Sequence, residues 1–150
     1  MPDFKPKPRN AAWLTPYLTL SNHEKTLKAY REAFGFEVDV RSEKDGLPEH
    51  LEISHGGKPI AMGGAEEYET GYGVGKSPAT MGIDAPQAFY IYVDDVDAHY
   101  AGLSRKRTIT VKEKPADRYW GDRAYTVTCP SGYTWMFASR LANPPADPGA

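Results

Sequence analysis

The chain has few of the features that would assign it to a specialised class. It contains a single cysteine, Cys129, which excludes an intrachain disulfide and a zinc site made of several thiolates, and which fits a reducing compartment. It has no apolar run of membrane-spanning length and no signal-peptide pattern. The sequence therefore predicts a cytoplasmic protein.

An excess of charge of one sign is also missing. The 150 residues include 18 Lys and Arg against 20 Asp and Glu, a formal net charge of -2, and these charges are scattered. Nucleic acids and anionic lipids are bound through clustered basic residues, so we expect neither nucleic acid nor membrane as a partner. The remaining partners are a small molecule or another protein.

What the chain does contain is one pattern of elements in two copies, first from Thr15 to about Met62 and again from Ala88 to about Phe137. Each copy is predicted to have a strand, a helix and then strands joined by a tight turn. One copy leaves an apolar face that it cannot bury alone, so the two must pair. The predicted organisation is a flexible N-terminal tail 1–12, one two-module domain 13–140 with modules of about 14–63 and 88–140 and a linker 64–87, and a flexible C-terminal tail 141–150.

Local signals place the elements within each copy. Ser21 and Glu24 form a capping box for the first helix, and Gly35 ends that helix. Asp94 offers the same kind of start to the second helix, on which His99 is predicted to face solvent. The predicted elements are strands 16–20 and 89–93, helices 23–34 and 96 to about 104, and hairpin turns 55–58 and 129–132.

Two segments, 33–36 at the end of the first helix and 92–98 at the start of the second, carry a family resemblance. With the order of the elements, they resemble the vicinal-oxygen-chelate superfamily, whose members include glyoxalases, bleomycin-resistance proteins and dioxygenases. The closing segments 120–123 and 129–137 resemble its phosphonate-operon-associated glyoxalase-like branch. The resemblance covers residues 14–140 and implies an α+β fold in which paired βαβββ modules form a curved mixed sheet around a cleft.

The resemblance also implies where a metal ion would bind. Metal-dependent members place His, Gln or Glu ligands on the first and fourth strands of each module. Carried over one by one, these positions hold Thr15 and Ala61 in the first module and Ala88 and Met136 in the second. Methyl, thioether and neutral hydroxyl groups are poor ligands for divalent ions. We therefore expect neither a metal ion nor another cofactor.

Alternation along the strands predicts which residues line the cleft. Successive side chains of a strand point to opposite faces, so burial of Leu18 and Leu20 against the first helix turns Tyr17 toward the cleft. By the symmetry of the modules, Thr126 and Thr128 also face it. The predicted ligand-binding residues are Thr15, Tyr17, His50, Glu52, Ala88, Tyr90, Tyr92, Trp120, Arg123, Thr134 and Met136.

Two of these residues have alternative interpretations. Glu52, the only carboxylate of the set, is either a general base or a solvated residue on a half-buried strand. Arg123 either clamps an anionic ligand together with Trp120 or forms a structural ion pair with Asp122 or Glu113. The sequence does not separate these alternatives.

Three functions from different classes remain open. The tyrosines of the predicted cleft favour metal-free binding of a small aromatic or amphipathic molecule. An enzyme is the second possibility, a glyoxalase-like lyase or isomerase or a dioxygenase, which is metal-dependent or uses Glu52 as its base. The third is a dimeric interaction module without an open ligand site. A homodimer is expected, because paired modules expose sheet edges.

Overall fold

The structure, a computed structural model, describes residues 3–67, 75–103 and 108–143. The chain forms two compact units, Met1–Ser77 and Pro78–Ala150. Each unit has a four-stranded sheet of its own, and each is described by itself. No helix among the described residues is long and apolar enough to cross a membrane.

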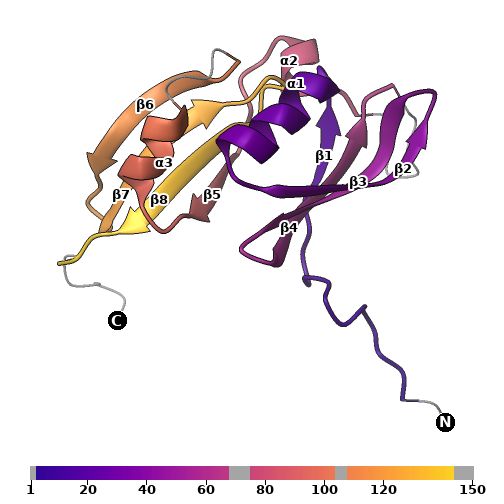
Figure 1. The fold of residues 1–150 in the computed structure, drawn as a ribbon, viewed down its shortest axis with the longest axis horizontal. Coiled ribbons are helices and arrows are strands. Elements are labelled where there is room, and N and C mark those ends of the chain that lie inside the picture. Colours follow the sequence, from indigo (N-terminus) through magenta and orange to yellow (C-terminus); the bar gives the residue numbers. More distant parts are fainter. Residues whose placement is uncertain (1–2, 68–74, 104–107, 144–150) are drawn as a thin grey trace. The chain divides into compact units, whose positions relative to one another are not determined.

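The sheet of the first unit is mixed (Figure 1). Its strand order is β1-β4-β3-β2, in which β1 pairs with β4 in parallel and the other neighbours are antiparallel. The helical segment lies between β1 and β2 in the chain. The elements are β1 (Tyr17–Leu20), α1 (His23–Lys28), the π-helix η1 (Ala29–Ala33), β2 (Glu37–Lys44), β3 (Leu47–His55) and β4 (Lys58–Ala65).

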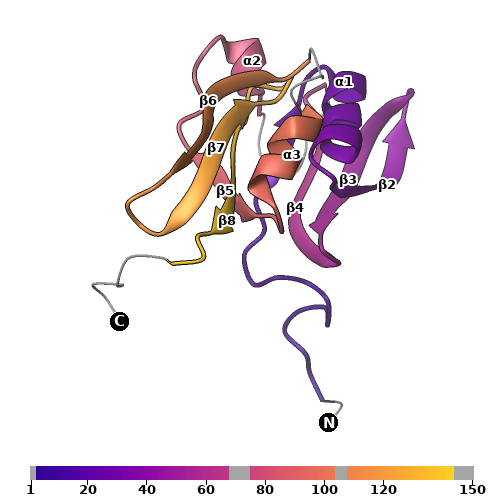
Figure 2. The ribbon, with the colours of Figure 1, turned by 60° about the vertical axis from the view of Figure 1, so that its left-hand side comes forward.

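The second unit repeats this arrangement, with the strand order β5-β8-β7-β6 (Figure 2). Again the first and last strands pair in parallel, and α3 contacts β6, β7 and β8. The predicted α+β class with two βαβββ modules is therefore confirmed. The elements are α2 (Pro78–Met81), β5 (Ala88–Tyr92), α3 (Val96–Leu103), β6 (Thr110–Asp117), β7 (Asp122–Thr128) and β8 (Thr134–Arg140).

The first helical segment departs from its prediction. The prediction of a capping box was wrong, because Asn22 is the N-cap and has no side-chain cap hydrogen bond. The Ser21 hydroxyl is instead buried against the Ser77 hydroxyl, with 2.5 Å between the oxygens. The segment then widens into η1, where the Phe34 N–H donates to the carbonyl of Ala29, five residues back, at 3.0 Å.

The second helix also begins differently. Its first turn is capped by Asp95 rather than Asp94, since the Asp95 Oδ1 accepts the Ala98 N–H at 3.1 Å. His99 does not face solvent freely, because its ring lies 4.4 Å from that of Phe137 and its Nδ1 lies 2.5 Å from the Tyr125 hydroxyl. Tyr125 is fully buried, so His99 fixes the helix to the sheet.

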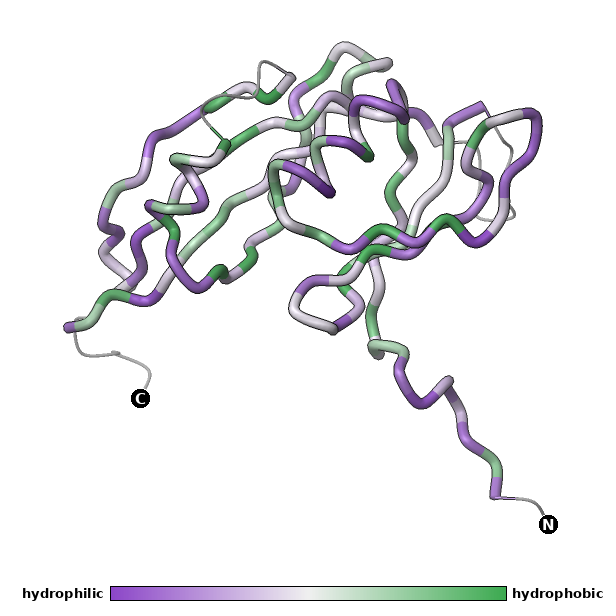
Figure 3. Tube along the Cα trace, in the orientation of Figure 1, coloured by the Kyte–Doolittle hydropathy of each residue, from purple (hydrophilic) through white to green (hydrophobic). Residues whose placement is uncertain are grey.

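Strand alternation produces the two cores. Apolar and hydrophilic residues alternate along the strands (Figure 3). Of the strand residues that alternation assigns to the core face, six are buried, namely Leu18, Leu20, Leu51, Ile53, Trp135 and Phe137, whereas Phe89, Ile91 and Val93 are half-buried. The predicted hairpin turns are confirmed as well, because β3 ends at His55, β4 begins at Lys58, and Gly56 and Gly57 between them both have positive φ.

Candidate functional site

The face of the second sheet opposite α3 carries most of the predicted ligand-binding residues of that unit, and we call it the tyrosine face. Its rows follow from the pairing register. Ala88 lies beside Thr134 and Thr128, Tyr90 beside Met136 and Thr126, and Tyr92 beside Ala138 and Ala124. Side chains directly opposite in a sheet share a face, so the sheet brings together Ala88, Tyr90, Tyr92, Thr134 and Met136.

Asp122 is the centre of a hydrogen-bond network on this face. Its Oδ2 accepts from the hydroxyls of Tyr90 at 2.6 Å and Tyr92 at 2.7 Å. Its Oδ1 lies 3.3 Å from Nη1 of Arg140, and Trp120 Nε1 donates to the Tyr90 hydroxyl at 2.9 Å. Two tyrosines, a tryptophan and an arginine are thereby held around one carboxylate.

Burial distinguishes the carboxylate from the rings. Asp122 is completely buried, whereas Tyr90, Tyr92 and Trp120 are 40%, 54% and 39% exposed. The rings of Tyr90 and Tyr92 meet edge to face at 5.6 Å, and those of Tyr90 and Trp120 at 6.4 Å. A solvent-facing aromatic surface is therefore fixed from below by a buried charge.

The network shifts the acidity of its members. Burial raises the pKa of Asp122, but the hydrogen bonds from Tyr90, Tyr92 and Arg140 outweigh burial and hold that pKa below its ordinary value. Burial and the bond to Asp122 raise the pKa of Tyr90 to about 12, and the same carboxylate raises the pKa of Tyr92. At neutral pH the carboxylate is thus charged and both hydroxyls keep their protons.

Two hydroxyls of the same face lack partners. The Oγ1 atoms of Thr126 and Thr128 are buried, and neither has a hydrogen-bond partner among the described residues. An unsatisfied buried hydroxyl costs about 1–3 kcal/mol. Both belong to the rows of Tyr90 and Ala88.

The predicted site residues of the first module lie on a second surface, the face of the first sheet that carries Glu52. The register aligns Tyr17, Met62, Glu52 and Asp39 in one row. Glu52 is half exposed and pairs with Arg41 at 3.0 Å. Nearby, the Tyr17 ring stacks with that of His50, which also belongs to the predicted set, at 6.5 Å.

A small pocket of about 250 Å³ adjoins this row. Thr15, Glu52, Ala61 and Met62 line it, together with Pro59 and with Pro8, Asn10, Ala11 and Ala12 of the N-terminal segment. Two of the predicted ligand-binding residues, Thr15 and Glu52, thus lie at one pocket.

The positions carried over for a metal ion do not fit one. Ala61 pairs with the fully buried Ile53 and is itself buried, so it belongs to the core face, and Met62 takes its place in the row of Tyr17 and Glu52. Neither residue has a good ligand for a divalent ion. No three His, Cys, Asp or Glu side chains of the described part of the chain lie close enough to share an ion.

Arg123 lies on the other side of the sheet from the tyrosines. Its guanidinium pairs with Asp97 of α3 and Asp117 of β6, each at 3.1 Å. Of the two interpretations that the sequence left open, the structure therefore supports an ion pair, although with different partners from those expected. Arg123 is not part of the tyrosine face.

Sequence reasoning missed Asp122 and Arg140, although a signal for both was present. Asp122 was considered only as a partner of Arg123. Counting back in steps of two from Thr126 places Asp122 on the tyrosine face, and counting forward from Met136 places Arg140 there. The same alternation assigns Arg123 to the opposite face.

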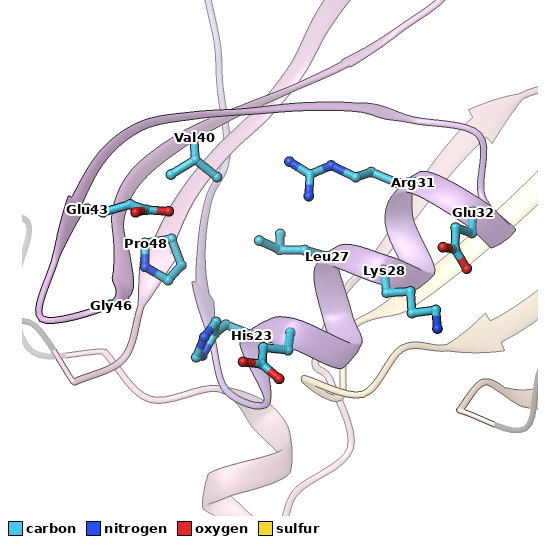
Figure 4. Close-up of a pocket in the computed structure, with 10 residues that line it drawn as sticks. His23, Leu27, Lys28, Arg31, Glu32, Val40, Glu43, Gly46 and Pro48 are labelled. Atoms are coloured by element: carbon cyan, nitrogen blue, oxygen red, sulfur yellow. The ribbon is translucent and has the colours of Figure 1, made fainter.

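A larger groove of about 600 Å³ lies elsewhere in the first unit, between α1 and the β2–β3 hairpin (Figure 4). Leu27, Val40 and Pro48 form its apolar part, and charges of both signs, such as Arg31 and Glu43, surround them. None of the predicted site residues lines it, so we do not include it in the candidate site.

Comparison with known structures agrees with the fold. TioX from Micromonospora sp. ML1 has a TM-score of 0.64 at 19% identity, covering 87% of this chain and 100% of that one. A superfamily member from Sphaerobacter thermophilus DSM 20745 has a TM-score of 0.58 at 20% identity, covering 85% and 97%. A glyoxalase-related enzyme from Fulvimarina pelagi has a TM-score of 0.57 at 16% identity, covering 85% and 88%.

Sequence comparison decides the family. No curated protein matches the chain, but the family model described as the Glyoxalase/Bleomycin resistance protein/Dioxygenase superfamily matches residues 13–137. This span includes both βαβββ modules almost completely. The chain therefore belongs to the glyoxalase/bleomycin resistance protein/dioxygenase superfamily.

Proposed function

We propose that this protein binds a small aromatic or amphipathic molecule on the tyrosine face, without a metal ion. The observation that carries the proposal is the fixed set of exposed rings, Tyr90, Tyr92 and Trp120, held by the buried carboxylate of Asp122. Side chains that are ordered before binding lose little entropy when a ligand arrives. The prediction that the ligand lies in a cleft between the modules stays a prediction.

The absence of a metal ion from the mechanism is part of the proposal. On the tyrosine face the carried-over positions hold the methyl group of Ala88 and the thioether of Met136. Asp122, the carboxylate of this face, is already bound by three donors. These groups support recognition through ring surfaces and hydrogen bonds rather than through coordination.

A neutral naphthalene probe, 2-naphthalenemethanol, tests the proposal by calorimetric titration of protein treated with a chelator. We expect binding to the wild type and a loss of about threefold to tenfold in affinity in Trp120→Ala, since an aromatic contact contributes about 0.5–1.5 kcal/mol. Trp13→Ala is the matched control, because Trp13 is 82% exposed and lies in the other unit. Equal losses in both variants, or no binding at all, would count against the proposal.

An enzymatic role for Glu52 has one supporting observation, the pocket that Glu52 lines with Thr15 and Met62. In this second candidate the carboxylate acts as a general base, and Arg41 orients it. The reaction would be that of a glyoxalase-like lyase or isomerase or of a dioxygenase. Glu52→Gln should then abolish turnover while sparing binding, and an unchanged rate would remove Glu52 from the mechanism.

We also propose a branch of the superfamily, a location and an oligomeric state for this protein. Segments 120–123 and 129–137 support the phosphonate-operon-associated glyoxalase-like branch through their resemblance to it. A single buried cysteine, Cys129, supports a cytoplasmic location. The balanced charge supports partners other than nucleic acid. The protein is proposed to form a homodimer, with or without an open ligand site. Its molar mass in solution, measured by light scattering, tests the dimer.

A further inference from the structure

We infer that the ligand of the tyrosine face carries an acidic group as well as its aromatic ring, and that the guanidinium of Arg140 binds that group. The inference rests on the proposed function, since it names the class of molecule that the same face takes. Two observations support it. Arg140 has N–H donors that the network does not use, and its charge is exposed whereas that of Asp122 is buried.

Arg140 is held in place but not fully used. Its Nη1 donates to the Trp120 carbonyl at 2.8 Å and lies 3.3 Å from Asp122 Oδ1. These contacts fix the plane of the guanidinium at the end of β8. Its Nε and Nη2 have no hydrogen-bond partner among the described residues, and the side chain is 49% exposed. Three N–H donors of Arg140 are therefore not engaged in the network among the described residues.

Around Asp122, the charge that a ligand on this face reaches is the positive charge of Arg140. The side chain of Asp122 is 1% exposed, and two tyrosine hydroxyls and Arg140 surround it. A ligand cation would therefore be kept from the carboxylate and would lie next to the exposed guanidinium. An anion beside Asp122 meets the half-exposed guanidinium of Arg140. The exposed carboxylate of Glu113, in the row of Thr126, is paired with Arg118 at 2.8 Å.

The tyrosines leave the recognition of an anion to Arg140. Both hydroxyl protons are donated to Asp122, so toward a ligand Tyr90 and Tyr92 offer ring surfaces and acceptor oxygens. An acidic group needs donors, and the free side of a guanidinium presents them in the spacing of two carboxylate oxygens. The tyrosine rings therefore contact the aromatic part of the ligand, and Arg140 binds its acidic group.

Two probes with the same ring test the inference, 2-naphthoate and 2-naphthalenemethanol, titrated into the full chain under the same conditions. We expect 2-naphthoate to bind the wild type at least about fivefold more tightly, as a charge-assisted hydrogen bond predicts. In Arg140→Gln this preference should disappear, so that the variant binds the two probes with equal affinity. The preference should also decrease as salt is added, because the ion pair is partly exposed.

Arg123→Gln is the matched control, since it removes the same charge from the opposite face of the same sheet. It should keep the preference for 2-naphthoate. Equal binding of the two probes to the wild type would overturn the inference but leave the proposed function standing, whereas no binding of either probe would overturn the proposed function. A preference lost equally in Arg140→Gln and Arg123→Gln would show a general effect of net charge and would also overturn the inference.

Discussion

Asp122 is the shared acceptor of the hydrogen-bond network on the tyrosine face. The carboxylate is fully buried, and its charge is stabilised by Tyr90, Tyr92 and Arg140. Removing the charge would leave two hydroxyls and a guanidinium without their common acceptor. We expect the rings then to lose the orientation on which the proposed ligand binding depends.

The pH dependence of stability should reveal this charge. Because the pKa of Asp122 is lower in the folded protein than its ordinary value of 3.8, its contribution is present above that value and is lost as the pH falls through the folded pKa. Denaturation of the wild type and of Asp122→Asn should therefore show a stability difference at pH 7 that shrinks in acid. Asp94→Asn, at an exposed position, is the control, and a difference that does not depend on pH would contradict the assignment.

At the scale of elements, the start of α3 offers a paired test. Asp95 accepts the Ala98 N–H, whereas Asp94 is exposed and makes no cap hydrogen bond to the helix among the described contacts. Asp95→Ala should lower the free energy of unfolding by about 0.5–2 kcal/mol, the usual effect of losing a cap. Asp94→Ala should change it by less than about 0.5 kcal/mol. Chemical denaturation measures the free energy of unfolding of each variant. A larger loss in Asp94→Ala than in Asp95→Ala would show that the cap is misassigned.

Two glycines differ in the space around them, Gly64 in the crowded strand β4 and Gly102 in the exposed part of α3. A Cβ on Gly64 would lie 2.4 Å from the carbonyl oxygen of Glu49 and 2.7 Å from the hydroxyl of Tyr17. Gly64→Ala should therefore destabilise the first unit by about 1–3 kcal/mol. A Cβ on Gly102 meets nothing within 4 Å, so Gly102→Ala should stabilise α3 by about 0.5–1 kcal/mol. Thermal unfolding measures the stability of both variants. An unchanged stability of Gly64→Ala would contradict the close approach of the chain segments around Gly64.

Elements were predictable where a local signal determined them. Two adjacent glycines, Gly56 and Gly57, set a hairpin turn whatever surrounds them, and alternation placed Leu18 and Leu20 in the core. The π-turn of η1 was not predictable, because it depends on how the helix packs rather than on its propensities. The use of Ser21 likewise depended on Ser77, which is distant in the sequence.

At the scale of the whole molecule, the repeat predicted the architecture. The two copies fold as two similar modules, and the alternation that identified Tyr90 and Tyr92 is realised in the register of β5 and β8. The network around Asp122 was not predicted, because it joins residues 30 and 32 positions apart in the chain. Only the register of β7 against β8 shows that Asp122 and Arg140 are neighbours.

The central claim is that the tyrosine face binds its aromatic ligand without a metal ion. The most direct measurement is a titration of 2-naphthalenemethanol into chelator-treated protein, repeated after zinc, nickel or manganese is restored. The account predicts the same affinity in every case, since the rings and the Asp122 network need no ion. Binding that occurs only after one of these ions is returned would contradict it and would identify this protein as metal-dependent.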